Sequence, residues 1–408
     1  MVRKRWLRIG AVAAIVFACV AAAARWEPAP DTRVLKRAEN DDGRGSIELV
    51  SAPYRLDRVY LSMTGPRGNQ PEIHLSNTAP ADETLWLTGI ETEVVAADSL
   101  ETISPEYFCH SNLTLNPETS SPELHNASFA APTHADWRFF TLVPGRMSMH
   151  LPPGFGVPVK NGTRLDNFTM ALNQNPGHPD QNIRLKTRVF YRRDEEGETM
   201  RPLFRRALYV YQQHAQPQSE KLAVVQTRGH QGAECAESCQ KEQRGMKPSS
   251  FADHSANPLD AHPGATCCVE NASLEGIVNQ FGAENTVHWM VPPGAHVYRS
   301  EVTKQFNLPA DTRVHYVTGH MHPFGRSLKL IDLESGETVL EIHGESRTDE
   351  LGVKLISEIS SSKGIPVSTG RRYELVAEYN NPTQAPIDAM AILYLYAAEP
   401  TTVAQAAK

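Results

Sequence analysis

The runs Ser327-Leu-Lys-Leu-Ile-Asp-Leu333 and Thr338-Val-Leu-Glu-Ile-His343 flank the short polar segment Glu334-Ser-Gly-Glu337. Apolar and polar residues alternate along both runs, and a period of two is typical of strands with one buried face. A glycine-containing turn between two such runs predicts a β-hairpin. This stretch therefore indicates an antiparallel sheet.

Short runs of the same kind recur along the chain and are separated by turn-forming residues. They cover residues 84–90, 107–114, 185–191 and 207–211, and then 311–322, 373–379 and 390–396. The chain has 408 residues, of which 40% are hydrophobic, so it can bury sizeable cores. We expect an all-β fold of two consecutive jelly-roll-like antiparallel β-sandwich domains with a Cys-rich segment between them.

The N-terminal segment has the composition of an export signal. Arg3, Lys4, Arg5 and Arg8 precede an apolar run over residues 9–24, which is shorter than the roughly 20 residues of a membrane-spanning helix. Residues 1–25 are predicted to be a signal peptide or an uncleaved membrane anchor. We therefore expect an exported protein, periplasmic or secreted, whose contact with a membrane would be limited to this segment.

The remaining boundaries follow from changes in composition. We expect a linker at residues 26–45, an N-terminal β-sandwich domain at 46–213 and a Cys-rich interdomain segment at 214–285. A C-terminal β-sandwich domain at 286–400 and a tail at 401–408 complete the chain. The net charge of −7 argues against a nucleic-acid partner, because no excess of positive charge is present to neutralise phosphates.

Export changes how the cysteines are interpreted. In an oxidising compartment Cys235, Cys239, Cys267 and Cys268 are candidates for two disulfides, which leaves Cys109 unpaired. The alternative is a metal cluster built on Cys235 and Cys239, although the His and Met that a dinuclear copper site would need just downstream are missing.

The pair His320-Met-His322 is the sharpest local motif. Residues two apart in a strand point to the same face, so both imidazoles can reach one ion; the alternative is two surface histidines. Met390 begins an apolar strand, where a methionine usually packs in the core, but its thioether is also a soft ligand suited to Cu(I). His288 and His296 are candidates to hydrogen-bond a metal ligand, although core or surface roles are commoner.

A family resemblance links these residues. The segments Gly319-His-Met-His-Pro-Phe-Gly-Arg-Ser-Leu-Lys-Leu330 and Asp388-Ala-Met-Ala-Ile-Leu-Tyr-Leu-Tyr396 resemble the C-terminal domain of the copper type II, ascorbate-dependent monooxygenases. These are the peptidylglycine α-hydroxylating and dopamine β-monooxygenase enzymes. The resemblance implies a fold of two jelly-roll-like domains and a dioxygen-activating copper held by His320, His322 and Met390. Residues 106–112 and 151–154 also resemble the stress-upregulated nodulin-19-like branch.

The first half departs from that family. The catalytic enzymes bind a second, electron-storing copper through an adjacent His pair and a later His, but here the pair reads Cys109-His110 and Asn173 stands near the third position. Only His110 matches. Neighbouring side chains alternate faces in a regular strand, so Cys109 and His110 are not expected to reach one ion together.

Two functional hypotheses follow, in addition to a scaffold without metal. One is a copper-dependent monooxygenase (an oxidoreductase) that acts on a small-molecule or peptide substrate and takes electrons from an external donor. The other is a non-catalytic copper-binding or copper-handling protein. One copper ion is expected under either of these two hypotheses, and the sequence leaves open whether a second copper ion binds.

Overall fold

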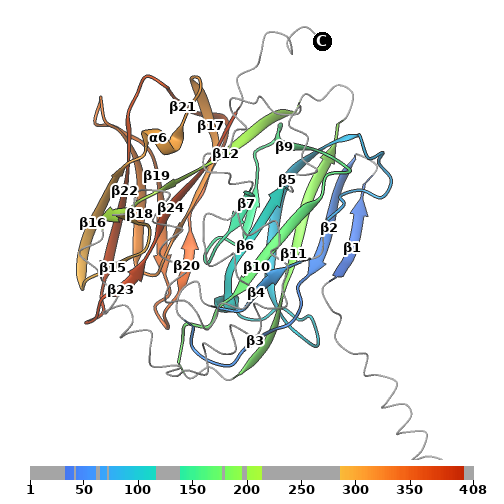
Figure 1. The fold of residues 1–408 in the computed structure, drawn as a ribbon, viewed down its shortest axis with the longest axis horizontal. Helices are drawn as coiled ribbons and strands as arrows, with labels where there is room; N and C mark the ends of the chain where they lie inside the picture. Colours follow the sequence, from blue (N-terminus) through green and yellow to red (C-terminus); the bar gives the residue numbers. More distant parts are fainter. Residues whose placement is uncertain are drawn as a thin grey trace, which may run out of the picture.

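The computed structural model describes residues 33–40, 43–60, 65–70, 73–115, 138–176, 180–194, 200–213 and 285–398. These residues form strands almost throughout (Figure 1), and the two short helical segments among them are η1 (Pro105–Tyr107) and α6 (Thr303–Phe306). None of the helices in this part of the chain is long and apolar enough to cross a membrane. The prediction of an all-β protein is confirmed.

One long sheet runs through the whole molecule. Its order is β1 (Arg33–Glu39), β2 (Arg44–Val50), β11 (Gln181–Arg193), β5 (Thr84–Ala96), β9 (Phe155–Lys160), β12 (Arg201–Tyr209), β24 (Ala391–Ala398), β17 (Thr312–Met321) and β21 (Ile359–Val367). β3 (Tyr54–Leu56) pairs with β11, and β8 (Ser148–His150) pairs with β5.

Each end of this long sheet is covered by a smaller sheet. The first contains β4 (Arg67–Asn69), β10 (Leu165–Ala171), β6 (Phe108–Leu115) and β7 (Arg138–Leu142). The second contains β16 (Gly294–Glu301), β22 (Tyr373–Asn381), β18 (Gly325–Asp332), β19 (Thr338–Ser346) and β20 (Val353–Ile356). Two small pairs complete the fold: β13 (Gln212–Gln213) with β14 (Asn285–Thr286), and β15 (Trp289–Val291) with β23 (Ile387–Ala389).

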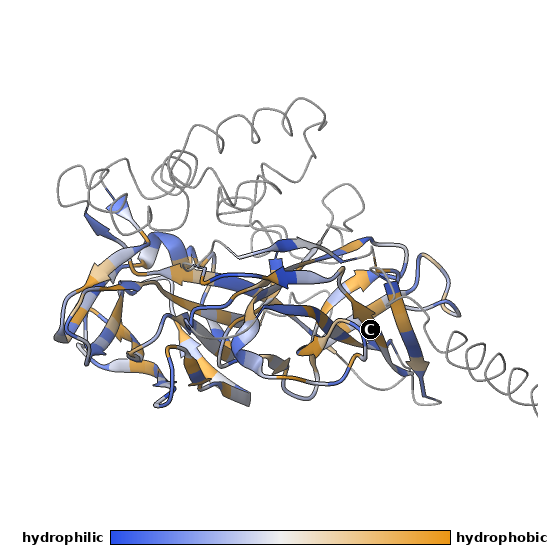
Figure 2. Ribbon diagram, turned by 90° about the horizontal axis from the view of Figure 1, so that it is seen from below, coloured by the Kyte–Doolittle hydropathy of each residue, from blue (hydrophilic) through white to orange (hydrophobic). Residues whose placement is uncertain are grey.

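The facing sheets enclose two apolar cores, one in each half of the molecule. In the first half, described between residues 33 and 213, side chains such as Leu185 of β11 and Leu113 of β6 share one core. In the second half, residues 285–398, Leu393 of β24 and Leu375 of β22 share the other. Figure 2 shows the strands stacked in layers, with hydrophobic and hydrophilic residues interspersed along them. The expected pair of β-sandwiches is confirmed.

Strand β24 explains how the two cores meet. Every residue from Ala391 to Ala397 is buried. Ile392, Tyr394 and Tyr396 pack into the first core, whereas Leu393 and Leu395 pack into the second. Because successive side chains point to opposite faces, a strand with a core on each side needs an unbroken apolar run.

The hairpin at residues 327–343 is confirmed. β18 and β19 pair antiparallel, with Ser327 opposite His343 and Leu330 opposite Leu340. Leu328, Leu330, Leu340 and Ile342 are buried, as the alternation predicts.

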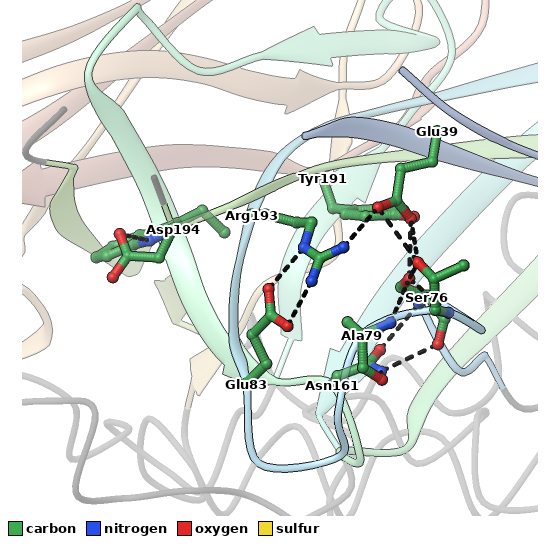
Figure 3. A network of polar contacts seen from close by, with 10 residues as sticks. Glu39, Ser76, Ala79, Glu83, Asn161, Tyr191, Arg193 and Asp194 are labelled. Carbon is green, nitrogen blue, oxygen red and sulfur yellow. Dashed lines mark hydrogen bonds and ion pairs between the residues drawn. The ribbon is translucent and has the colours of Figure 1, made fainter. Parts of the chain in front are cut away.

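The expected linker at residues 26–45 is contradicted over part of its length. Residues 33–39 form β1, which pairs with β2 and extends the long sheet. The polarity of this segment reflects an edge strand, which keeps its charged side chains toward water. Figure 3 shows how it is attached: the Glu39 carboxylate accepts hydrogen bonds from Tyr191 (2.8 Å) and Arg193 (3.1 Å).

Further contacts extend this network into the neighbouring loops. Ser76 donates to Glu39 over 2.8 Å, and Asn161 Nδ2 donates to the carbonyls of Ser76 and Ala79 (Figure 3). The Arg193 guanidinium also forms two parallel bonds with Glu83, at 2.7 and 2.8 Å. Bidentate pairs of this kind fix geometry as well as adding attraction, so β1 is held by side chains in addition to its backbone ladder.

Strand β12 changes the expected domain organisation. It belongs to the first half in sequence, yet it pairs antiparallel with β24 from Leu203 to Tyr209 and parallel with β9 at Arg201 and Pro202. The two sandwiches therefore share one sheet, which contains strands from both expected domains, 46–213 and 286–400 (Figure 1). Residues 1–25, residues 214–284 with Cys235, Cys239, Cys267 and Cys268, and the tail at 401–408 lie outside the described residues, so the signal and disulfide predictions stay predictions.

Candidate metal centre

His320 and His322 lie at the end of β17, where the strand enters the turn before β18. Their rings are 5.0 Å apart, centroid to centroid, and nearly perpendicular at 84°. Their side chains share one face of the strand and do not stack, as the spacing predicts. A Cβ on the preceding Gly319 would lie 2.6 Å from Ile342 Cδ1 and 2.8 Å from the carbonyl oxygen of Ile392, so close packing requires glycine there.

Met390 comes next to this pair through strand register. His320 lies opposite Ile392 and Met321 opposite Ala391 in the β17–β24 ladder. The next step places His322 opposite Met390, and the His322 amide donates to the Met390 carbonyl over 3.3 Å. Directly opposite residues share a face, so the thioether lies on the face of the sheet that carries both imidazoles. The register thus brings Met390 beside the motif, which sequence spacing alone could not show.

An imidazole from the first half lies beside the His320-Met-His322 motif. The ring of His110, on β6, lies 5.2 Å from the ring of His320. His110 is buried, and in the β6–β10 ladder it faces Met170, which is also buried. The one family ligand that the first half retains is thus adjacent to the second-half motif.

Cys109 contradicts the expectation from strand alternation. Its Sγ lies 2.9 Å from Nδ1 of His110. The reason is a β-bulge: in the β6–β10 ladder Phe108 pairs with Ala171 and His110 with Met170, so Cys109 is the extra residue between them. A bulge bends the strand and redirects a side chain, so neighbouring residues can lie together.

Asp388, for which the sequence predicts no metal role, and His288, a candidate to hydrogen-bond a metal ligand, lie beside His322. Asp388 Oδ2 lies 3.0 Å from Nδ1 of His322, and Asp388 Oδ1 lies 3.5 Å from Nδ1 of His288. One ligand atom from each of these three residues lies within 4.8 Å of the others. A carboxylate that holds the Nδ1 side of an imidazole fixes its orientation and directs Nε2 elsewhere, as is common around metal ligands. The pairing of β15 with β23 brings His288 here, whereas the sequence alone names it only beside His296 as a candidate to hydrogen-bond a metal ligand.

Electrostatics keep the central imidazoles neutral. Burial, reinforced by His322, lowers the pKa of His110 to about 3, and burial with the same neighbour lowers the pKa of His320 well below its usual value. Burial would raise the pKa of Asp388, but attraction to His322 and the hydrogen bond with His288 outweigh it and hold that pKa low. Neutral imidazoles keep a lone pair, which a metal requires.

The ring nitrogens of His320 and His288 indicate whether a metal fits this site. Neither ring nitrogen of His320 has a hydrogen-bond partner among the described residues, although this side chain is only 3% exposed, and Nε2 of His288 also lacks one. A buried donor or acceptor left unpaired costs about 1–3 kcal/mol. Coordination would satisfy a ring nitrogen of His320. Imidazoles and a thioether are donor types that suit copper, so the chemistry of His320, His322 and Met390 fits this metal. Among the described residues, the His, Cys, Asp and Glu ligand atoms that lie within 4.8 Å of one another in groups of three or more are those of His288, His322 and Asp388.

The remaining candidates lie elsewhere. Of the other described first-half histidines, His74 and His150 are exposed, and His150 bonds Glu91. His296 contacts the carbonyl of Pro293. Asn173 is buried and accepts a hydrogen bond from the Asn175 amide. Among the described residues, the first half therefore holds no second group of three imidazoles.

Comparison with known proteins does not identify a family. No family model and no curated protein matches the chain. Similar solved structures include the STIV MCP, at 8% identity over 88% of this chain and 100% of that one, with a TM-score of 0.32. The cowpea mosaic virus top component has 8% identity over 92% and 93% of the chains, with a TM-score of 0.33. Such distant likenesses carry no argument about function, and the resemblance to copper monooxygenases stays a prediction.

Proposed function

We propose that this chain is an exported copper-binding protein whose metal is held where its two sandwiches meet. The observation that carries the proposal is His320, a buried, neutral imidazole. Neither of its ring nitrogens has a partner among the described residues, and two other imidazole rings lie within 5.2 Å. His322 and Met390 complete the donor set that the resemblance implies. His110 adds an imidazole from the first half.

The roles within the site follow from the contacts. His320 and His322 supply nitrogen ligands from one strand, and Met390 supplies a sulfur that favours Cu(I). Asp388 accepts the Nδ1 proton of His322 and so holds the ring in the tautomer that leaves Nε2 for a metal. Asp388 and His288 form the more exposed side of the cluster, with side chains 40% and 22% exposed.

Replacing Met390 by leucine tests the proposal. Leucine has nearly the volume of methionine, so the fold should be kept at a cost below about 1.5 kcal/mol. We expect affinity for Cu(I) to fall by at least about tenfold, and affinity for Cu(II) to fall much less, because only the soft ion favours a thioether. Competition with chromogenic copper chelators measures both.

Met321→Leu is the matched control. Met321 lies between the two histidines, is also buried, and packs into the second core on the opposite face of β17. Its replacement should leave both affinities unchanged. Equal losses for Cu(I) and Cu(II) in Met390→Leu, or a Cu(I) loss of the same size in Met321→Leu, would exclude Met390 as a ligand.

A copper-dependent monooxygenase is the second candidate. Bound copper would supply dioxygen activation, and hydroxylation of a small-molecule or peptide C–H bond would draw two electrons from an external donor. The exposed side at His288 and Asp388 favours this candidate, because a substrate needs an approach to the metal. Reductant-dependent dioxygen consumption by the copper-loaded protein, measured with and without candidate substrates, distinguishes the enzyme from a copper-handling protein.

A further inference from the structure

Three side chains that can bind a metal meet beside the His320-Met-His322 motif. One ligand atom each from His288, His322 and Asp388 lies within 4.8 Å of the others. The Asp388 carboxylate stands between the two imidazoles, with Oδ2 3.0 Å from Nδ1 of His322 and Oδ1 3.5 Å from Nδ1 of His288. Two ligand atoms that are each about 2.1 Å from one zinc ion lie roughly 3.0–3.5 Å apart, so these separations suit a shared ion.

Strand pairing holds the three residues in place. Asp388 lies on β23, opposite Met290 of β15, and His288 directly precedes β15. Thr286 fixes the backbone of His288, because its Oγ1 accepts from the His288 amide over 3.1 Å and donates to the His288 carbonyl over 2.8 Å. His322 directly follows β17. Ligands that are positioned by strands rather than by free loops keep the spacing that a metal site needs.

The surroundings allow an ion to enter. The side chain of Asp388 is 40% exposed and that of His322 only 5%, so the three ligands form a site with one side open to solvent. Nε2 of His288 is buried and has no hydrogen-bond partner among the described residues. The His288 ring can therefore turn to present a nitrogen to an ion without breaking a hydrogen bond on that side.

We propose that His288, His322 and Asp388 form a second metal site, which binds Zn²⁺ and is distinct from the copper site of the proposed function. Two imidazoles and a carboxylate suit a borderline divalent ion, whereas Cu(I) prefers sulfur. Three protein ligands with an open side leave a fourth position for water, as in zinc sites that are not purely structural. On binding, a nitrogen–zinc bond replaces the N–H bond of His322 Nδ1, and the proton passes to solvent. Nε2 of His322 remains for the copper.

Zinc affinity of the full chain tests this inference, measured by competition with a chromogenic zinc chelator. We expect the affinity of one site per chain to fall by at least about tenfold in His288→Ala and in Asp388→Asn. His296→Ala is the matched control, because His296 contacts the Pro293 carbonyl and is not one of the three ligands. Zinc bound elsewhere in the chain is the same in all these proteins, and two different replacements guard against misfolding of one.

Met390→Leu separates this inference from the proposed function. We expect it to keep its zinc affinity while it loses Cu(I) affinity, and His288→Ala to show the reverse. Unchanged zinc binding in both His288→Ala and Asp388→Asn would overturn the zinc site and leave the copper site standing. A zinc loss in Met390→Leu as large as in His288→Ala would also overturn it, because one site would then serve both metals. Wild-type protein that binds zinc as expected but no Cu(I) would overturn the proposed function alone.

Discussion

Replacing His320 by alanine is expected to weaken Cu(I) binding by more than about 100-fold, since loss of a residue that merely supports a ligand already costs 10–100-fold. The ring of His320 lies 5.2 Å from that of His110 and 5.0 Å from that of His322, and its ring nitrogens have no partner among the described residues. The change removes a metal donor and breaks no side-chain hydrogen bond among the described residues. Equilibrium competition with a Cu(I) chelator measures the loss.

His315→Ala is the matched control for this prediction. His315 lies on the same strand, is also buried, and packs its ring 4.0 Å from that of Phe155, with a hydrogen bond to the Ser361 carbonyl. Alanine there opens a cavity of similar size away from the cluster. Copper affinity should be retained in His315→Ala; a loss as large as in His320→Ala would mean that packing, rather than coordination, explains the effect.

Replacing Tyr396 by alanine is expected to lower the free energy of unfolding by about 3–5 kcal/mol, as for other large buried aromatic residues. Tyr396 is fully buried on β24, stacks on Phe140 of β7 at 6.0 Å, and meets Tyr316 edge-on at 5.7 Å. Its hydroxyl donates to the carbonyl of Phe139. The residue thus belongs to a second-half strand but packs in the first core.

Two further variants serve as references for the size of this loss in unfolding free energy. Tyr396→Phe keeps the ring and leaves the Phe139 carbonyl without this donor, so it should cost about 1–3 kcal/mol. Val297→Ala, at a site that is 54% exposed on β16, should change stability by less than about 0.5 kcal/mol. Denaturant unfolding monitored by circular dichroism measures all three. A loss below about 1 kcal/mol in Tyr396→Ala would contradict the account of β24 as the shared wall of both cores.

Much of the fold could be predicted from local patterns. Alternation at 327–343 identified a hairpin, and the apolar run at 390–396 identified a strand, because both signals depend on neighbouring residues. Pairing between distant strands leaves no such signal. β12 pairs with β24 through contacts between distant parts of the chain. β1 has the composition of a linker, because an edge strand carries the same charged residues as a loop.

The candidate site also has one part that local sequence could predict and one part that it could not. His320 and His322 could be paired from sequence because their spacing is local. The contact of Cys109 with His110 could not, since it depends on a bulge whose position is set by the pairing partner on β10. The proximity of His110 and His288 to the motif likewise arises from strand register. Such contacts between separate strands decide which histidines form one centre.

Copper stoichiometry tests the central claim, that one centre is assembled from both halves. Copper per chain is measured in the reconstituted full-length protein and in a His110→Ala, His320→Ala, His322→Ala variant, whose retained cysteines correct for binding elsewhere. The account predicts a difference of one copper per chain. A difference of two would mean that His110 serves a separate ion, and a difference of zero would mean that the cluster does not bind copper.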